Sequence, residues 1–153
     1  MKTIIPVLHN VSSSQKVVET AKLIYGLGYK NFIVTKATGS AAQIGVPDAQ
    51  KIALKKRTNF FYLGDIDDVI ELFKPDLVLT VVSGKYTDTL LEDIINEIRN
   101  KEKILLIFGG MDPGLSKIEM EKGKPVSPSH IEENIGAIGL IAITLYTLLT
   151  IFE

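Results

Sequence analysis

Short apolar runs alternate with amphipathic segments along the whole chain, and this pattern predicts strands that alternate with helices. Strands are expected at residues 3–8, 32–35, 59–63, 76–82 and 104–108. Helices are expected at 14–27, 47–56 and 66–73, at 88–98 after a cap at Thr87, and from a capping box at Ser129-His130-Ile131-Glu132 to residue 152. The pattern indicates about five parallel strands with helices on both faces, in one α/β domain over residues 1–153.

The strand at 104–108 carries no charge and breaks directly into the turn Gly109-Gly110-Met111-Asp112-Pro113-Gly114. A strand buried on both faces belongs to a parallel sheet, and its carboxyl end is where open α/β sheets bind ligands. Gly109 and Gly110 would let a ligand approach the backbone, so their replacement by valine is expected to abolish binding with little unfolding. Pro113-Gly114 fits a type II turn. The alternative is a plain strand-to-helix connection.

The composition limits the kinds of site and partner that the chain can have. The chain has 153 residues, 46% of them hydrophobic, a formal net charge of −1 and no cysteine. Without cysteine there are no disulfides or thiolate metal ligands, which fits a cytoplasmic protein, and two histidines alone do not indicate a metal site. The near-zero charge gives no general attraction for a polyanion, so RNA would need a local basic patch. The candidates are Lys51, Lys55, Lys56 and Arg57, whose alternative role is that of an ordinary solvated helix face.

The segment 135–152 is uncharged over its whole length and meets the length criterion for a membrane span. Its glycines and threonines, and the acidic Glu132 and Glu133 before it, favour instead a helix that is buried on more than one side. One apolar face can cover the sheet, and the second needs another partner. We therefore expect no membrane contact and a homodimer formed through this C-terminal helix.

Two motifs connect the chain with a known family. Phe108, Gly109, Gly114 and Leu115 match a loop of the form Phe-Gly-x-x-x-x-Gly-Leu, and Pro125-Val126-Ser127-Pro128-Ser129 then precedes Asn134-Ile135-Gly136-Ala137-Ile138-Gly139. In order and length the chain resembles the SPOUT superfamily of S-adenosylmethionine-dependent RNA methyltransferases, in particular the ribose 2′-O-methyltransferase branch.

The resemblance implies a C-terminal trefoil knot, S-adenosyl-L-methionine as cofactor and a homodimer built on the last helix. The cofactor would lie among three loops, at Val82, Ser83, Gly84, Phe108, Gly109, Gly110, Asp112, Gly114, Val126, Ser127, Pro128 and Asn134.

The match to the family is incomplete on the substrate side. The family's arginine in the first helix corresponds to Glu19, where a carboxylate would repel an RNA backbone, and the usual glutamate of the glycine loop falls at Met111. Asn10 and His130 are the candidate catalytic residues, and His9 is a further candidate at the end of the first strand.

Three hypotheses stay open at this point. The first is a methyltransferase that acts on tRNA or rRNA, and the second is an inactive SPOUT-fold protein that binds RNA or the cofactor. The third is an unknotted Rossmann-like nucleotide-binding domain, although the sequence has neither a Gly-x-Gly-x-x-Gly motif nor a phosphate-binding loop with lysine.

Overall fold

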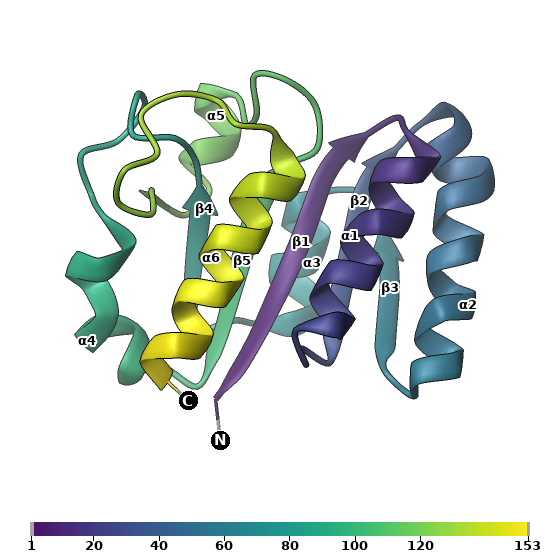
Figure 1. Cartoon of the computed structure of the whole chain (residues 1–153), viewed down its shortest axis with the longest axis horizontal. Coiled ribbons are helices and arrows are strands. Elements are labelled where there is room, and N and C mark those ends of the chain that lie inside the picture. Colours follow the sequence, from purple (N-terminus) through teal and green to yellow (C-terminus); the bar gives the residue numbers. More distant parts are fainter. Residues whose placement is uncertain (1, 153) are drawn as a thin grey trace.

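The computed structural model describes residues 2–152, so the two terminal residues of the predicted domain lie outside the described residues. A six-stranded parallel sheet in the order β3-β2-β1-β5-β4-β6 forms the centre of the molecule (Figure 1). The α/β class and the parallel sheet are as predicted. The strands are β1 (Thr3–Val11), β2 (Asn31–Ala37), β3 (Asn59–Leu63), β4 (Leu77–Val81), β5 (Lys103–Gly109) and β6 (Lys124–Val126).

The sixth strand was not expected from the sequence. It has only three residues, one of which is Pro125, and so shows no periodicity. Proline is tolerated in edge strands because it lacks the N–H that a central strand must donate. β6 is the outermost strand on one side of the sheet and pairs with β4 in parallel. The carboxyl ends of β6 and β4 therefore point the same way.

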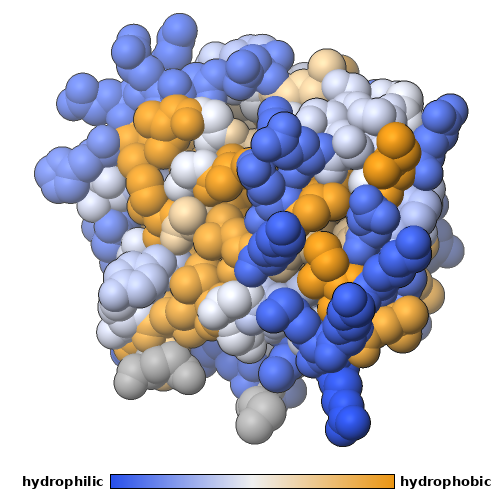
Figure 2. Space-filling view, turned by 45° about the vertical axis from the view of Figure 1, so that its right-hand side comes forward, coloured by the Kyte–Doolittle hydropathy of each residue, from blue (hydrophilic) through white to orange (hydrophobic). Residues whose placement is uncertain are grey.

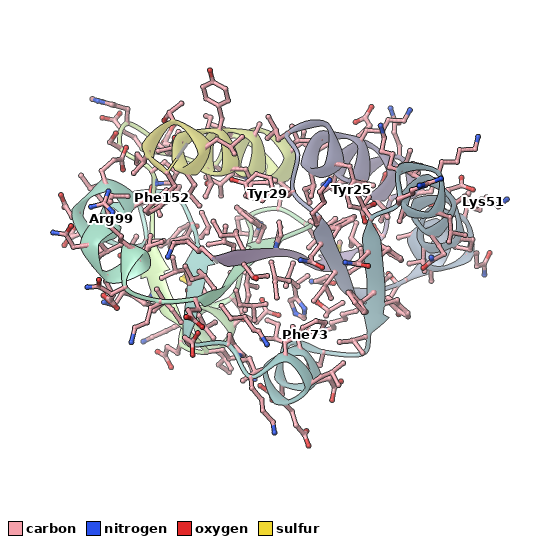
Figure 3. The ribbon with its side chains drawn as sticks, turned by 90° about the horizontal axis from the view of Figure 1, so that it is seen from below. Tyr25, Tyr29, Lys51, Phe73, Arg99 and Phe152 are labelled. Carbon is pink, nitrogen blue, oxygen red and sulfur yellow. The ribbon has the colours of Figure 1, made fainter. Side chains whose placement is uncertain are left out.

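Helices cover both faces of the sheet, as predicted. Figures 1 and 3 show α1, α2 and α6 along one face and α3 on the other. Buried side chains of α4 join the first layer, and those of α5 join the second. The helices are α1 (Ser14–Gly26), α2 (Val46–Lys56), α3 (Ile66–Phe73), α4 (Ile95–Arg99), α5 (Lys117–Met120) and α6 (Ala137–Phe152), with a π-helix, η1 (Ala41–Gly45), before α2 and a 3₁₀ helix, η2 (Leu91–Ile94), before α4.

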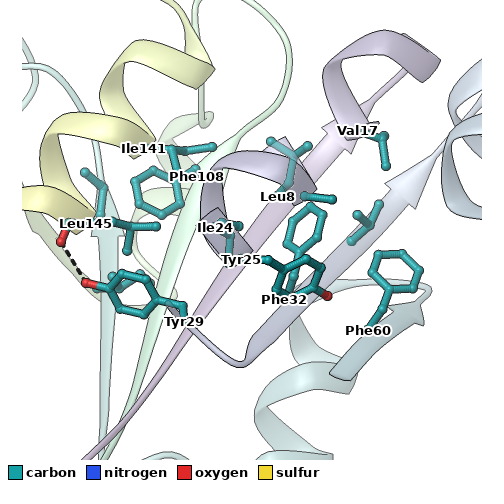
Figure 4. Packing of buried hydrophobic residues seen from close by; sticks show 14 of the residues in the cluster. Leu8, Val17, Ile24, Tyr25, Tyr29, Phe32, Phe60, Phe108, Ile141 and Leu145 are labelled. Atoms are coloured by element: carbon teal, nitrogen blue, oxygen red, sulfur yellow. Dashed lines mark hydrogen bonds between the residues drawn. The ribbon is translucent and has the colours of Figure 1, made fainter. Parts of the chain in front are cut away.

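The larger core lies between the sheet and the layer of α1, α2 and α6 (Figure 4). Leu8, Phe32 and Phe108 are at most 1% exposed, and each such side chain contributes about 1.5–3 kcal/mol on burial. The Tyr29 hydroxyl donates a 2.7 Å hydrogen bond to the Leu145 carbonyl, which ties the end of α1 to α6. These contacts hold α1 and α6 beside each other on the same face of the sheet.

Two predicted helix starts are wrong. The last helix begins at Ala137, and the Ser129 capping box does not form because the Ser129 N–H and hydroxyl both donate to the Glu92 carboxylate. The predicted helix at 88–98 is a 3₁₀ turn followed by the short α4, and the Thr87 hydroxyl donates to the Pro125 carbonyl. At Ser129 a long-range contact replaces the local cap, whereas the Thr87 hydroxyl also accepts from the Thr89 N–H at 3.1 Å but no α-helix follows directly.

α6 has 16 residues, and no helix in the part of the chain that the structure describes is both long and apolar enough for a membrane span.

Candidate functional site

A pocket of about 480 Å³ opens at the carboxyl ends of β4 and β5. Its walls come from three segments that are far apart in the sequence: residues 81–86, the glycine loop at 109–115, and residues 131–137 at the start of α6. Parallel sheets present their strand ends at one edge, and ligand sites of open α/β folds lie there. The pocket is therefore where the sequence places a ligand site.

The glycine loop is folded tightly against its own backbone. A Cβ on Gly109 would lie 2.6 Å from the carbonyl carbon of Gly114, and one on Gly110 would lie 2.7 Å from the carbonyl oxygen of Asn10. These two glycines are therefore required by the packing of the chain itself. The expectation that valine would abolish binding with little unfolding is corrected: valine at either position would also disturb the fold.

The turn that closes the loop also differs from the prediction. The Gly114 N–H donates to the Met111 carbonyl at 2.7 Å, and the Asp112–Pro113 peptide is cis, so proline occupies the third position of a type VI turn. Gly114 has φ of +119°, a conformation that only glycine adopts readily.

A buried hydroxyl in the pocket wall has no partner. Ser83 lines the pocket and is 7% exposed, and its Oγ makes no hydrogen bond within residues 2–152. An unpaired buried hydroxyl costs about 1–3 kcal/mol, and such groups are rare in folded proteins. The hydroxyl is therefore available to hydrogen-bond a ligand in the pocket.

Charged and polar side chains stand around the same pocket. The Lys16 ammonium, from the first turn of α1, donates a 2.8 Å hydrogen bond to the Gly110 carbonyl and lines the pocket. The Asn134 amide donates to Asp112 at 3.0 Å, and its oxygen accepts from the Gly136 N–H at 2.9 Å. This pair links the glycine loop to the segment before α6.

Sequence reasoning selected Glu19 and missed Lys16. Glu19 is exposed, accepts from the Gln15 amide and does not line the pocket. Lys16 lies three residues earlier, in the turn that begins at the Ser13 cap. The first turn of α1 follows the carboxyl end of β1, so its position beside the glycine loop could have been inferred from the parallel topology.

The structure brings most of the predicted cofactor residues together. Phe108 and Val126 are buried beneath the pocket, and Gly84, Ser127 and Pro128 line a neighbouring hollow of about 710 Å³. Those that line the pocket itself are Val82, Ser83, Gly109, Gly110, Asp112, Gly114 and Asn134.

The candidate catalytic residues lie near this edge of the sheet but outside the lining of the pocket. Asn10, the penultimate residue of β1, has φ of +64°, and its carbonyl faces Gly110. His130, with φ of +69°, is exposed and lines the neighbouring hollow.

His9 is 1% exposed and lies in a hydrogen-bonded chain. Its Nδ1 lies 2.7 Å from the Thr35 hydroxyl, and its Nε2 lies 2.8 Å from a carboxylate oxygen of Glu119. Burial alone would raise the pKa of Glu119, but hydrogen bonds from the Ser116 N–H and from His9 outweigh it, so the pKa lies below its usual value.

The loops at this edge are joined by backbone hydrogen bonds. The Gly84 N–H donates to the Ile131 carbonyl at 2.5 Å, and the Leu91 N–H donates to the Ser127 carbonyl at 2.8 Å. These bonds hold the segment after β4 against the segment after β6. The trefoil knot at this place stays a prediction from the resemblance.

The predicted basic patch lies elsewhere. Lys51, Lys55, Lys56 and Arg57 are all exposed, but the last three end α2 directly before β3. They therefore lie toward the amino edge of the parallel sheet, away from the pocket.

No group of three histidine, aspartate or glutamate side chains that could hold a metal ion occurs among the described residues.

The fold is that of the SPOUT methyltransferases. A probable methyltransferase from Bordetella pertussis Tohama I superimposes with a TM-score of 0.78 at 10% identity, over 99% of this chain and 97% of that one. The SpoU methyltransferase AviRb from Streptomyces viridochromogenes, in complex with AdoMet, gives a TM-score of 0.74 at 16% identity, over 99% of this chain and 59% of that one. At such identities the likeness shows a shared fold.

By sequence, the chain belongs to the family described as RecB-family nuclease (DUF2122), whose model matches residues 39–147. It is 36% identical over 139 residues to the protein named "Putative type II restriction enzyme MjaORF1200P" of Methanocaldococcus jannaschii, a match that covers 91% of each chain.

Proposed function

We propose that this protein is an S-adenosylmethionine-dependent methyltransferase that modifies RNA. The observation that carries the proposal is the pocket at the ends of β4 and β5, with the unpaired Ser83 hydroxyl in its wall. The same fold occurs in the AviRb methyltransferase solved with AdoMet. The absence of cysteine and the need for both RNA and cofactor fit the predicted location in the cytoplasm.

The residues present fit this cofactor. The wall of the pocket combines apolar side chains with a few polar groups, as the walls of small-molecule sites do. Ser83 and the backbone of the glycine loop would provide hydrogen bonds, while Val82 and Leu140 would contact apolar parts of the ligand. When bound, S-adenosylmethionine supplies an activated methyl group.

In this proposal Lys16 supplies a positive charge that would attract the RNA substrate. Its ammonium has three donors, of which one is bonded to Gly110, so two are free to bind a phosphate of the substrate. A positive charge at this position would offset the repulsion of an RNA backbone by Glu19. We propose that Asn10 orients the target group and that His130, in the neighbouring hollow, accepts its proton.

We further propose that the active form is a homodimer formed through α6. Ile143 and Tyr146 of α6 are 39% and 61% exposed, and Ile135, just before the helix, is 48% exposed, although the helix has no charged residue. Figure 2 shows the resulting apolar stripe on the surface. A second copy would cover it, since isologous contacts between apolar helices are the commonest way to bury such a face.

Calorimetric titration with S-adenosylhomocysteine tests the cofactor proposal. The wild type should bind, and Ser83→Ala should weaken binding about 3- to 10-fold, because one hydrogen bond is lost. Thr20→Val is the matched control, since the Thr20 hydroxyl is also buried and unpaired but lies outside the pocket. A wild type that binds neither this ligand nor S-adenosylmethionine would refute the proposal.

Nucleic-acid cleavage is the second candidate function, because the family and the Methanocaldococcus relative carry nuclease names. Two-metal nucleases use side chains clustered around the ions, and residues 2–152 contain no such group. Incubation of plasmid DNA with the protein and Mg²⁺ or Mn²⁺ decides between the two. Cleavage by the wild type, unaffected by Ser83→Ala, would favour the nuclease.

A further inference from the structure

His9 makes contact with both ends of the segment that forms one wall of the pocket. Its backbone carbonyl accepts a 2.7 Å hydrogen bond from the Gly110 N–H, where the segment begins. Its imidazole Nε2 lies 2.8 Å from Glu119, where the segment ends. One residue of β1 therefore holds the glycine loop at its start and α5 at its end.

We propose that His9 and Glu119 form a clamp that positions the glycine loop for ligand binding, with His9 as a positioning residue rather than a catalytic one. The expected effect of the clamp on affinity rests on the proposed cofactor pocket. Its expected effect on the order of the loop does not depend on any ligand.

The arrangement Thr35–His9–Glu119 has the connectivity of a hydroxyl, imidazole and carboxylate relay. Thr35 is fully buried, however, and none of the three side chains lines the pocket, so no substrate reaches the hydroxyl. The chain of hydrogen bonds is therefore suited to hold elements together. It connects β1 and β2 to α5 across the end of the sheet.

Glu119 is well placed to transmit the clamp to the loop. One carboxylate oxygen faces His9, and the other accepts from the Ser116 N–H at 2.8 Å in a reciprocal cap of α5. Ser116 directly follows Leu115, the last loop residue in the pocket wall. The carboxylate thus fixes the backbone at the point where the loop leaves the pocket.

Lys16 and Asn134 hold the first part of the segment through Gly110 and Asp112, and few side-chain contacts besides that of His9 hold the part near α5. The Thr80 hydroxyl donates to the Met120 carbonyl at 2.9 Å, and the ion pair between Lys122 and Asp67 is exposed and of little energy. In the His9–Glu119 contact, by comparison, the imidazole is buried in the core at 1% exposure and the carboxylate is only 18% exposed. It is therefore the contact that can couple loop position to the core.

Three variants separate positioning from stability. Glu119→Ala removes the clamp and should lower the affinity for S-adenosylhomocysteine at least about fivefold, a coupling of the usual size between linked sites. Glu119→Gln should restore most of it, because the amide can accept from Ser116 and donate to His9. Thr35→Val removes the other imidazole contact without touching the loop and should leave the affinity within about twofold, whatever it does to the melting temperature.

Hydrogen exchange gives a readout that needs no ligand, and an NMR signal of the imidazole reports on the His9 contact when ligand binds. In Glu119→Ala, amide hydrogen exchange should accelerate over residues 109–116 more than over β1 and β5. The chain has two histidines, so His130→Gln leaves one imidazole NMR signal, which should shift when S-adenosylhomocysteine binds.

The clamp would be overturned if hydrogen exchange over residues 109–116 were equal in all variants. It would also be overturned if the loss of affinity simply followed the loss of melting temperature, in Thr35→Val as in Glu119→Ala. A wild type that binds no ligand but shows faster loop exchange in Glu119→Ala would refute the cofactor and retain the clamp.

Discussion

Substituting alanine for Gly109 or Gly110 should destabilise the protein even without a ligand. The added Cβ would lie 2.6 Å from Gly114 in one case and 2.7 Å from Asn10 in the other, far inside ordinary contact. Both neighbours are backbone atoms and cannot rotate away. Overpacking of this kind costs about 1–3 kcal/mol.

Urea unfolding followed by circular dichroism measures this cost. With a slope on the order of 2 kcal/mol per M, the midpoint should fall by about 0.5–1.5 M in each variant. Gly26→Ala is the matched control, because a Cβ at this last residue of α1 meets nothing within 4 Å. Alanine there should stabilise the helix by about 0.5–1 kcal/mol.

The reasoning would be refuted if Gly109→Ala and Gly110→Ala kept the wild-type midpoint. If they also lost affinity for S-adenosylhomocysteine, the glycines would serve ligand approach, as the sequence alone suggested.

Three further predictions follow from the surface and from Glu119. Tyr146→Glu should convert the proposed dimer to a monomer in sedimentation experiments at micromolar concentration, and a wild type that is already monomeric would contradict it. Lys16→Ala should weaken RNA binding more than the charge-matched change Lys56→Ala, because Lys16 adjoins the pocket; equal losses in filter binding would favour a diffuse basic surface. Because the pKa of Glu119 is lowered in the folded state, its stabilising effect is present above the ordinary carboxyl pKa and is lost as pH falls through the folded value. The difference in unfolding free energy between wild type and Glu119→Gln should therefore shrink in acid, and a difference that is constant with pH would contradict this.

Local patterns in the sequence were enough to predict the main strands and the ligand edge. The uncharged run before Gly109 could only be a buried strand, and β3 was predicted with its observed bounds, Asn59–Leu63. The helix that follows was also predicted with its observed bounds, Ile66–Phe73. In each case the signal lies within a few neighbouring residues.

What escaped prediction depends on contacts between distant residues. The Ser129 box failed because Glu92 provides a partner 37 residues away. Lys16 and Gly110 are 94 residues apart, and His9 and Glu119 are 110 residues apart. Local periodicity carries no information about such pairs, so the sequence located the pocket but not the side chains that support it.

The pocket needs a longer part of the chain than the sheet does, because its three walls come from distant segments. They come from the segments near residues 82, 110 and 134, so the last wall exists only when most of the chain is present. A nascent chain that ends before residue 131 can already contain β1 to β6 but has no closed pocket. Ligand binding would therefore report that the chain has been made and folded as far as the start of α6, whereas protection of the central strands would report only an earlier stage.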